Sequence, residues 1–140
     1  METDSPFLLA AVSLLSALQM GYLARRVGLS RITHKVLPPS VTGPPEFERT
    51  FRAHQNCVEC YPVFLVTLWT CGLFFSEVTA AAGGLLYIIA RQIYVNGYVK
   101  STKKRLLGFY LTLAVFVTLS LLGLSGILHG ILHKYFHIHL

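Results

Sequence analysis

The hydropathy of this chain alternates between long apolar runs and short polar segments. A bilayer is crossed by about 20 apolar residues in a helix, and four runs reach that length, at about residues 7–31, 46–75, 79–100 and 105–128. Residues 37–45, rich in proline and glycine, predict a loop, and residues 76–77 a very short turn. The pattern predicts one all-α domain over residues 1–140, an integral membrane four-helix bundle with four transmembrane helices.

Composition strengthens the membrane prediction and argues against nucleic-acid binding. The chain is 54% hydrophobic and 13% charged, whereas soluble domains carry about 25% charged residues. The net charge is +6, but the basic residues flank apolar runs instead of forming a basic helical face. We therefore expect membrane lipid, and no nucleic acid, among the partners.

The distribution of basic residues predicts an orientation in the membrane. Lysine and arginine concentrate after the first span and between the third and fourth spans. By the positive-inside rule, both basic loops face the cytosol and both termini face the lumen or exterior. The acidic N-terminal head, METDS, is not typical of a cleaved signal peptide.

The second predicted helix carries a polar face where it meets its apolar run. Arg49, Arg52, Asn56 and Glu59 are spaced by three, four and three residues, which places them on one side of a helix. Ionisable groups at membrane depth cost about 2.5–3.5 kcal/mol each on insertion scales. Their presence there indicates a buried site.

The third predicted helix carries a matching stripe of Tyr87, Arg91, Tyr94 and Tyr98. The end of the first helix and the end of the third loop each add an arginine at similar depth, Arg31 and Arg105. Guanidinium groups bind carboxylates, and Glu59 can receive an ammonium group. The polar positions therefore suit a small zwitterion, with room for an apolar ligand from the bilayer.

Simpler explanations exist for several of these residues. Arg52 and Glu59 could form a structural ion pair, and Tyr94 and Tyr98 could belong to an interfacial aromatic belt. The lysines before Arg105 are expected to be interfacial anchors.

The cysteines and histidines do not predict a metal site. Cys57 and Cys60 form a CxxC pair without a second ligand pair, so we interpret them as apolar thiols. The ladder His129, His133 and His137 has helical spacing but no acidic or cysteine partner. We expect these histidines to be interfacial polar residues, and no metal cofactor.

Three motifs resemble the membrane-associated eicosanoid and glutathione metabolism (MAPEG) family: GPPEFERTFRAHQNCVECYP, ARQIYVNGY and KKRLLGFY. The resemblance covers about Leu8 to Ile127. It implies a homotrimer of the endoplasmic reticulum and nuclear envelope membranes, with one glutathione site at each subunit interface. A homotrimer also agrees with the polar stripes, which cannot face lipid.

The resemblance implies a role for each polar residue. Arg105 matches the family arginine that holds the glutathione sulfur as a thiolate, and His54 stands where some members have a glutamine contact. A guanidinium cannot act as a conventional base, but its permanent charge stabilises a thiolate. The residues that match family glutathione contacts are Arg31, Arg52, Asn56, Glu59, Tyr94 and Tyr98.

Two departures separate this chain from the leukotriene-synthase branch. Ile32 replaces a second arginine, and Cys60 replaces a tyrosine that is phenylalanine in the broader transferase branch. We expect an enzyme that conjugates glutathione, its co-substrate, to lipophilic electrophiles, with leukotriene A4 as a candidate substrate giving leukotriene C4. The alternative is a non-catalytic lipid-binding scaffold, as found in a third branch. Glu59 and Arg105 favour the enzyme.

Overall fold

The structure, a computed structural model, describes residues 5–137. It contains α1 (Phe7–His34), α2 (Pro45–Phe74), α3 (Glu77–Lys100), the short 3₁₀ helix η1 (Thr102–Arg105) and α4 (Leu106–Phe136), with no strand among the described residues. All four α-helical segments are long and apolar enough to cross a membrane. The predicted all-α class with four spanning helices is confirmed.

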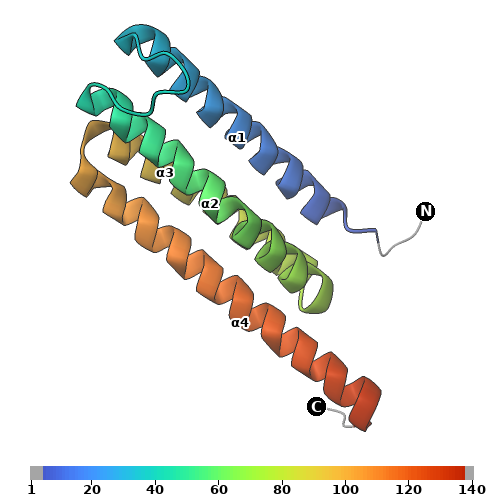
Figure 1. Cartoon of the computed structure of the whole chain (residues 1–140). Helices are drawn as coiled ribbons and strands as arrows, with labels where there is room; N and C mark the ends of the chain where they lie inside the picture. The colour runs from blue at the N-terminus through green and yellow to red at the C-terminus, as the bar shows by residue number, and fades with distance from the viewer. Residues whose placement is uncertain (1–4, 138–140) are drawn as a thin grey trace.

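The helices lie side by side in an up-and-down bundle (Figure 1). The central pair, α2 and α3, makes the most extensive contacts, and each of these helices also packs against both α1 and α4. The α1–α2 loop and η1 lie at one end of the bundle, and both chain ends lie at the other (Figure 1). We call the first the loop end and the second the terminal end.

Two helix ends differ from the sequence prediction. The first helix ends at His34, not at residue 31, and the last continues to Phe136, eight residues beyond the predicted limit. Both run on until a residue adopts the left-handed conformation, at Lys35 (φ 58°) and at His137 (φ 57°). Residues 129–136 contain no proline to stop α4 earlier, so its last two turns include part of the histidine-rich tail.

Local sequence signals account for the starts of α2 and α3. Pro45 occupies the first turn of α2, where its missing N–H costs nothing. Glu48 stabilises this end, because its carboxylate accepts a hydrogen bond of 3.1 Å from the Gly43 backbone N–H. The start of α3 is capped by Ser76, whose hydroxyl accepts the Thr79 N–H at 3.2 Å.

The larger of two apolar core clusters fills the terminal half of the bundle, and a smaller one lies towards the loop end, formed by Leu23, Ala53, Cys57, Tyr94 and Val95. Phe64 of α2 and Tyr87 of α3 stack with ring centroids 3.8 Å apart, and Leu9 and Leu119 close the core from the flanking helices. In lipid, helices associate through close packing because burial from water supplies little driving force between them. Gly126 illustrates this, since its Cα lies directly against the α2 backbone.

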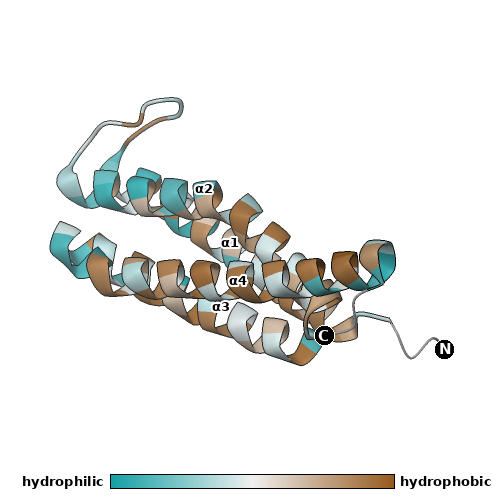
Figure 2. Ribbon diagram, turned by 90° about the horizontal axis from the view of Figure 1, so that it is seen from below, coloured by the Kyte–Doolittle hydropathy of each residue, from teal (hydrophilic) through white to brown (hydrophobic). Residues whose placement is uncertain are grey.

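The outer surface is divided along the bundle axis. Hydrophobic residues cover the middle of the helices, whereas hydrophilic residues gather at the loop end (Figure 2). Large apolar side chains on all four helices are more than half exposed, including Leu18, Val66, Leu86 and Leu121. This surface suits lipid, and the chain is a multi-pass membrane protein.

Candidate functional site

A buried arginine joins three helices between the apolar core and the loop end. Arg91 of α3 is 1% exposed. Its Nε and Nη2 atoms both donate to Thr112 Oγ1 on α4, at 3.1 and 2.9 Å, and Nη1 donates to Asn56 Oδ1 on α2 at 2.7 Å. The guanidinium therefore fixes α2 and α4 relative to α3.

Arg91 forms no ion pair with a carboxylate among the described residues, and neutral groups stabilise its positive charge instead. The group lies over the Tyr94 ring, with Cζ 4.2 Å from its centroid, and Nη1 contacts Cys57 Sγ at 3.6 Å and Cys60 Sγ at 3.8 Å. Hydrogen bonds of a charged group contribute about 1.5–3 kcal/mol each, and a desolvated cation–π contact about 2 kcal/mol. Together these offset a desolvation penalty of several kcal/mol.

From Arg91 a continuous string of side chains leads to the loop end. The Tyr94 and Tyr98 rings meet edge to face with centroids 5.7 Å apart. Arg105 then lies over the Tyr98 ring, with Cζ 5.6 Å from its centroid. The structure thus brings together four of the expected site residues: Asn56, Tyr94, Tyr98 and Arg105. We call these four residues and Arg91 the polar string.

Arg105 is held in place by the short helix that carries it. Its Nη1 donates to the backbone carbonyl of Thr102, one turn earlier in η1. The Gly97 Cα lies directly against the Lys104 backbone, leaving no space for a side chain, and Gly108 is equally close to the backbone of Tyr94. These glycines let η1 and the start of α4 approach α3, which places Arg105 over Tyr98.

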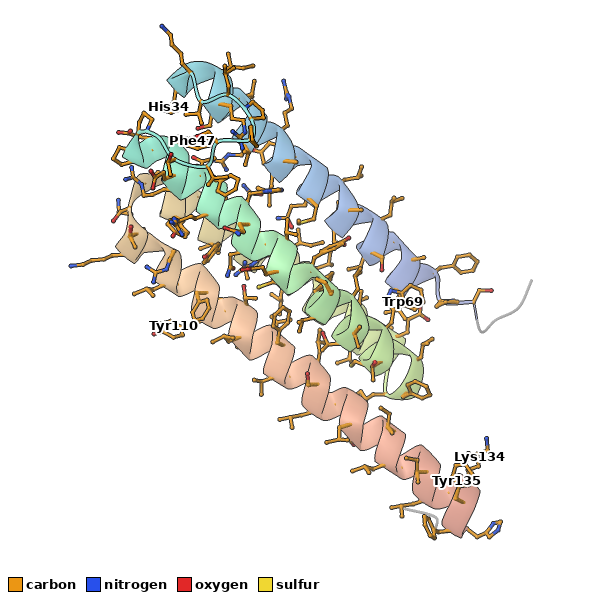
Figure 3. All side chains as sticks on the ribbon, in the orientation of Figure 1. His34, Phe47, Trp69, Tyr110, Lys134 and Tyr135 are labelled. Atoms are coloured by element: carbon orange, nitrogen blue, oxygen red, sulfur yellow. The ribbon has the colours of Figure 1, made fainter. Side chains whose placement is uncertain are left out.

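Arg31 belongs to a different part of the same end. It lies over the rings of Phe47 and Phe51, at 5.2 and 5.8 Å, and its Nη1 donates to the Ser40 carbonyl at 2.7 Å. Phe47 marks this corner beside the α1–α2 loop, far from Lys134 at the terminal end (Figure 3). Within the described part of one subunit, the hydrogen bonds and ring contacts of Arg31 go to the α1–α2 loop and the start of α2, and not to the polar string.

The remaining expected residues lie on the surface of α2. Arg52 and Glu59 are exposed, and His54 is half-buried. Among the described residues Arg52 and Glu59 form no ion pair, so the structural-ion-pair alternative does not hold within one subunit. Arg49, on the same face, instead donates from Nε to the Val99 carbonyl at 3.1 Å and fixes α2 to the end of α3.

Arg91 is the residue that the expected ligand set leaves out. Sequence spacing places it in the stripe of the third helix, but the motif match carries no role for it. The available signal is its position, a single charge in an apolar run three residues before Tyr94. A charge there requires buried partners, and Asn56 and Thr112 provide them.

The described residues offer no cluster of metal ligands. Among residues 5–137, no group of three or more histidine, cysteine, aspartate or glutamate side chains could hold a metal ion. Cys57 and Cys71 are buried free thiols, and Cys60 is a half-buried one. His129 and His133 lie on the extended last turns of α4.

The fold and the site together define a class of membrane protein. Four apolar helices span the membrane, and a string of arginine, tyrosine and amide side chains forms a polar site towards one end of the bundle. Residues 9–125 match the MAPEG family, and the chain belongs to this family.

The curated relatives match nearly the full chain. Human microsomal glutathione S-transferase 2 is 53% identical over 128 residues, which are 91% of this chain and 87% of that protein. The bovine protein of the same name is 52% identical over 131 residues, 94% of this chain and 90% of its own length. Bovine leukotriene C4 synthase is 45% identical over 124 residues, 86% of this chain and 83% of its length. The resemblance inferred from the motifs is confirmed.

Proposed function

We propose that the protein is a membrane-bound glutathione transferase, which joins the glutathione thiolate to lipophilic electrophiles and accepts leukotriene A4 among them. The names of its relatives support the reaction class. The observation that carries the proposal is the placement of Arg105 over Tyr98, at the open end of the polar string. A permanent cation is thereby held where a bound thiol can approach it.

The charged ends of glutathione have chemically matching groups on α2. Its carboxylates suit the guanidinium of Arg52, and its ammonium group suits Glu59. Asn56 and the tyrosines of the polar string supply neutral hydrogen-bonding groups beside them. We infer that Arg52, Glu59 and Asn56 bind the tripeptide, while Arg105 acts on its sulfur.

Arg105 supplies the activation of the thiol. A free thiol has a pKa of about 8.5–9 and is mostly protonated at neutral pH. Lowering that pKa by two units requires about 2.7 kcal/mol of preferential thiolate stabilisation, which one guanidinium in a dry site can supply. With an epoxide substrate, the thiolate sulfur forms the S–C bond, the C–O bond breaks, and the resulting alkoxide takes a proton from water.

We further propose that the site lies between subunits of a homotrimer. In a single subunit Arg52 and Glu59 are exposed, and Glu59, two turns deeper in α2 than Arg52, would pay about 2.5–3.5 kcal/mol to face lipid. Arg31 is separate from the polar string of its own subunit, so we infer that a neighbouring copy presents its Arg31 to that string. We place the trimer in the endoplasmic reticulum and nuclear envelope, with the loop end cytosolic and the termini lumenal.

The proposal is tested with purified protein in mild detergent. Glutathione is incubated with leukotriene A4 and, separately, with a simple lipophilic epoxide, and the conjugates are quantified by mass spectrometry. We expect enzyme-dependent conjugation of both electrophiles, saturating with glutathione. Absence of catalysis with every electrophile, by protein that still binds glutathione, would contradict the transferase proposal and favour a lipid-binding scaffold.

A further inference from the structure

A groove runs along the seam between α1 and α3, on a different side of the bundle from the exposed charges of α2. It has a volume of about 450 Å³ and an apolar floor formed by Leu15, Leu18, Tyr22, Ile88 and Ile89. Leu18 is 65% exposed and Ile89 55% exposed, so the groove is open to the surroundings. The proposed glutathione site uses none of these residues.

Polar side chains follow this seam towards the loop end. Gln19 on α1 donates from Nε2 to the Ile88 carbonyl at 2.8 Å and to Gln92 Oε1 at 3.5 Å. Gln92 in turn donates to Asn96 Oδ1 at 3.1 Å, and Arg26 Nη1 donates to the same oxygen at 2.7 Å. The groove itself is lined by apolar and amide groups, and the cation of Arg26 lies beyond it on the same seam, towards the loop end.

The cation at the end of this seam has no acidic partner in the described structure. Arg26 is bound by an amide oxygen only, and neighbouring Arg25 is exposed, without a contact to any described side chain. A guanidinium carries five N–H donors, so both arginines keep donors available. Their combined positive charge is complementary to an anion.

The spacing of these features matches one leaflet of a bilayer. Arg26 lies eleven residues after Leu15, which is about 16 Å along a helix at 1.5 Å per residue. Half of the hydrocarbon core of a bilayer is about 15 Å thick. With Leu15 near the midplane, Arg26 lies at the edge of the hydrocarbon core, from which its long side chain reaches the lipid phosphates. Gln19, about 6 Å along the helix from Leu15, lies inside the hydrocarbon.

We propose that the α1–α3 seam binds an anionic phospholipid. The phosphate contacts Arg25 and Arg26, and an acyl chain passes Gln19 and Gln92 and fills the apolar floor. Basic pockets between spanning helices are a recurrent site for anionic headgroups.

A phospholipid suits this seam better than a second copy of the chain. Glu59, exposed on α2 two turns deeper than Arg52, cannot be solvated by acyl chains, so α2 is the face that needs a protein neighbour. The seam instead presents apolar groups at depth and cations at the surface, which is the order of groups in a lipid. The inference is independent of the proposed transferase activity.

The test compares lipids retained by the purified protein. The protein is incorporated into nanodiscs of phosphatidylcholine with a minor fraction of phosphatidylinositol, re-extracted in mild detergent and examined by native mass spectrometry. We expect phosphatidylinositol to be enriched on the wild type. The Arg25→Gln, Arg26→Gln double variant should lose most of that enrichment, since each basic residue near an anionic surface contributes about 1 kcal/mol, or about fivefold.

The control double variant is Lys103→Gln, Lys104→Gln, which removes the same charge from the other basic loop and should retain the lipid. The single variant Arg25→Gln disturbs no side-chain contact of the fold and should lose a smaller share of the enrichment. The proposal is overturned by equal retention of both lipids, by equal losses in both double variants, or by displacement of the bound lipid by a lipophilic epoxide. Efficient cross-linking of a Leu18→Cys variant to a second copy would also overturn it.

Discussion

The Arg91 guanidinium donates a 2.7 Å hydrogen bond to the side-chain oxygen of Asn56, joining α3 to α2 beneath the proposed glutathione site. Asn56 is therefore oriented by a residue that is itself buried and does not need to touch the substrate. The same guanidinium lies on the Tyr94 ring. Arg91 is thus a positioning residue for two of the expected glutathione contacts.

Arg91→Met should weaken glutathione binding through the loss of this orientation. We expect a loss of about 1.5–3 kcal/mol of binding free energy, the range for hydrogen bonds of charged groups. This loss corresponds to a more than tenfold higher Kd for glutathione. Glutathione titration of the wild type, Arg91→Met, Asn56→Ala and the double variant forms a double-mutant cycle. Because Arg91 acts through Asn56, the two losses should not add.

Thr112→Val serves as the control for Arg91, since it removes the α4 anchor of the guanidinium and leaves the Asn56 hydrogen bond. It should lower thermal stability but change glutathione affinity much less than Arg91→Met does. Fully additive losses for Arg91 and Asn56, or equal binding losses in the Thr112 and Arg91 variants, would assign Arg91 a purely structural role.

Gly97→Ala should impair catalysis by moving η1. A Cβ at this position would overlap the Lys104 backbone, so η1 must shift away from α3 and carry Arg105 with it. We expect kcat to fall at least tenfold while the helix content measured by circular dichroism stays unchanged. Gly28→Ala is the matched control, because its Cβ would meet nothing within 4 Å; a similar loss of kcat in both variants would exclude this explanation.

Arg52→Ala and Glu59→Gln should chiefly weaken glutathione binding. Each removes one charged contact to the tripeptide, which costs about 1.5–3 kcal/mol, and neither residue stabilises the fold of a single subunit through an ion pair. Isothermal titration with glutathione measures the loss. Glu46→Gln, an exposed carboxylate at the start of α2, should bind normally; normal binding by the Arg52 or Glu59 variant would show that α2 does not hold glutathione.

A homotrimer should be seen by native mass spectrometry in mild detergent. The physical reason is the exposed charge of Glu59 at membrane depth, which a neighbouring subunit must cover. Disruption to monomers should abolish activity, because the proposed site needs Arg31 from another copy. Fully active monomers would contradict a site between subunits.

The number and approximate limits of the helices follow from hydropathy, because spanning the bilayer imposes a minimum length that the sequence displays. The extra lengths of α1 and α4 could not be predicted from hydropathy. They depend on where the backbone becomes left-handed, at Lys35 and His137. Hydropathy also could not place residues 102–105 in a 3₁₀ turn. That turn depends on the close approach of the Gly97 and Lys104 backbones.

The site was predictable only in part. Helical spacing places Tyr94 and Tyr98 on one face, and the structure brings Asn56 and Arg105 next to them, while their role in binding glutathione stays a prediction. The separate position of Arg31 was not predictable, because it depends on how the α1–α2 loop folds over Phe47. Spacing within one helix carries no information on such contacts between elements.

The central claim is that Arg105 alone of its basic loop activates the glutathione thiol. Lys103, Lys104 and Arg105 are adjacent, but Arg105 is the one whose charge lies over the Tyr98 ring. A cation lowers the pKa of the thiol substantially only when it lies within about 4–6 Å of the sulfur. The three residues should therefore not be interchangeable.

The most direct measurement is the ultraviolet absorbance of the thiolate of glutathione bound at neutral pH, recorded together with kcat. Arg105→Ala should abolish the thiolate signal and lower kcat about a hundredfold or more, a loss of about 2.7 kcal/mol, with a smaller change in glutathione affinity. Raising the pH should partly restore the rate, because the thiol then ionises unaided. Lys103→Ala should leave the thiolate signal, kcat and affinity nearly unchanged, whereas an Arg105→Ala enzyme with a normal thiolate signal and near-normal kcat at neutral pH would contradict the mechanism.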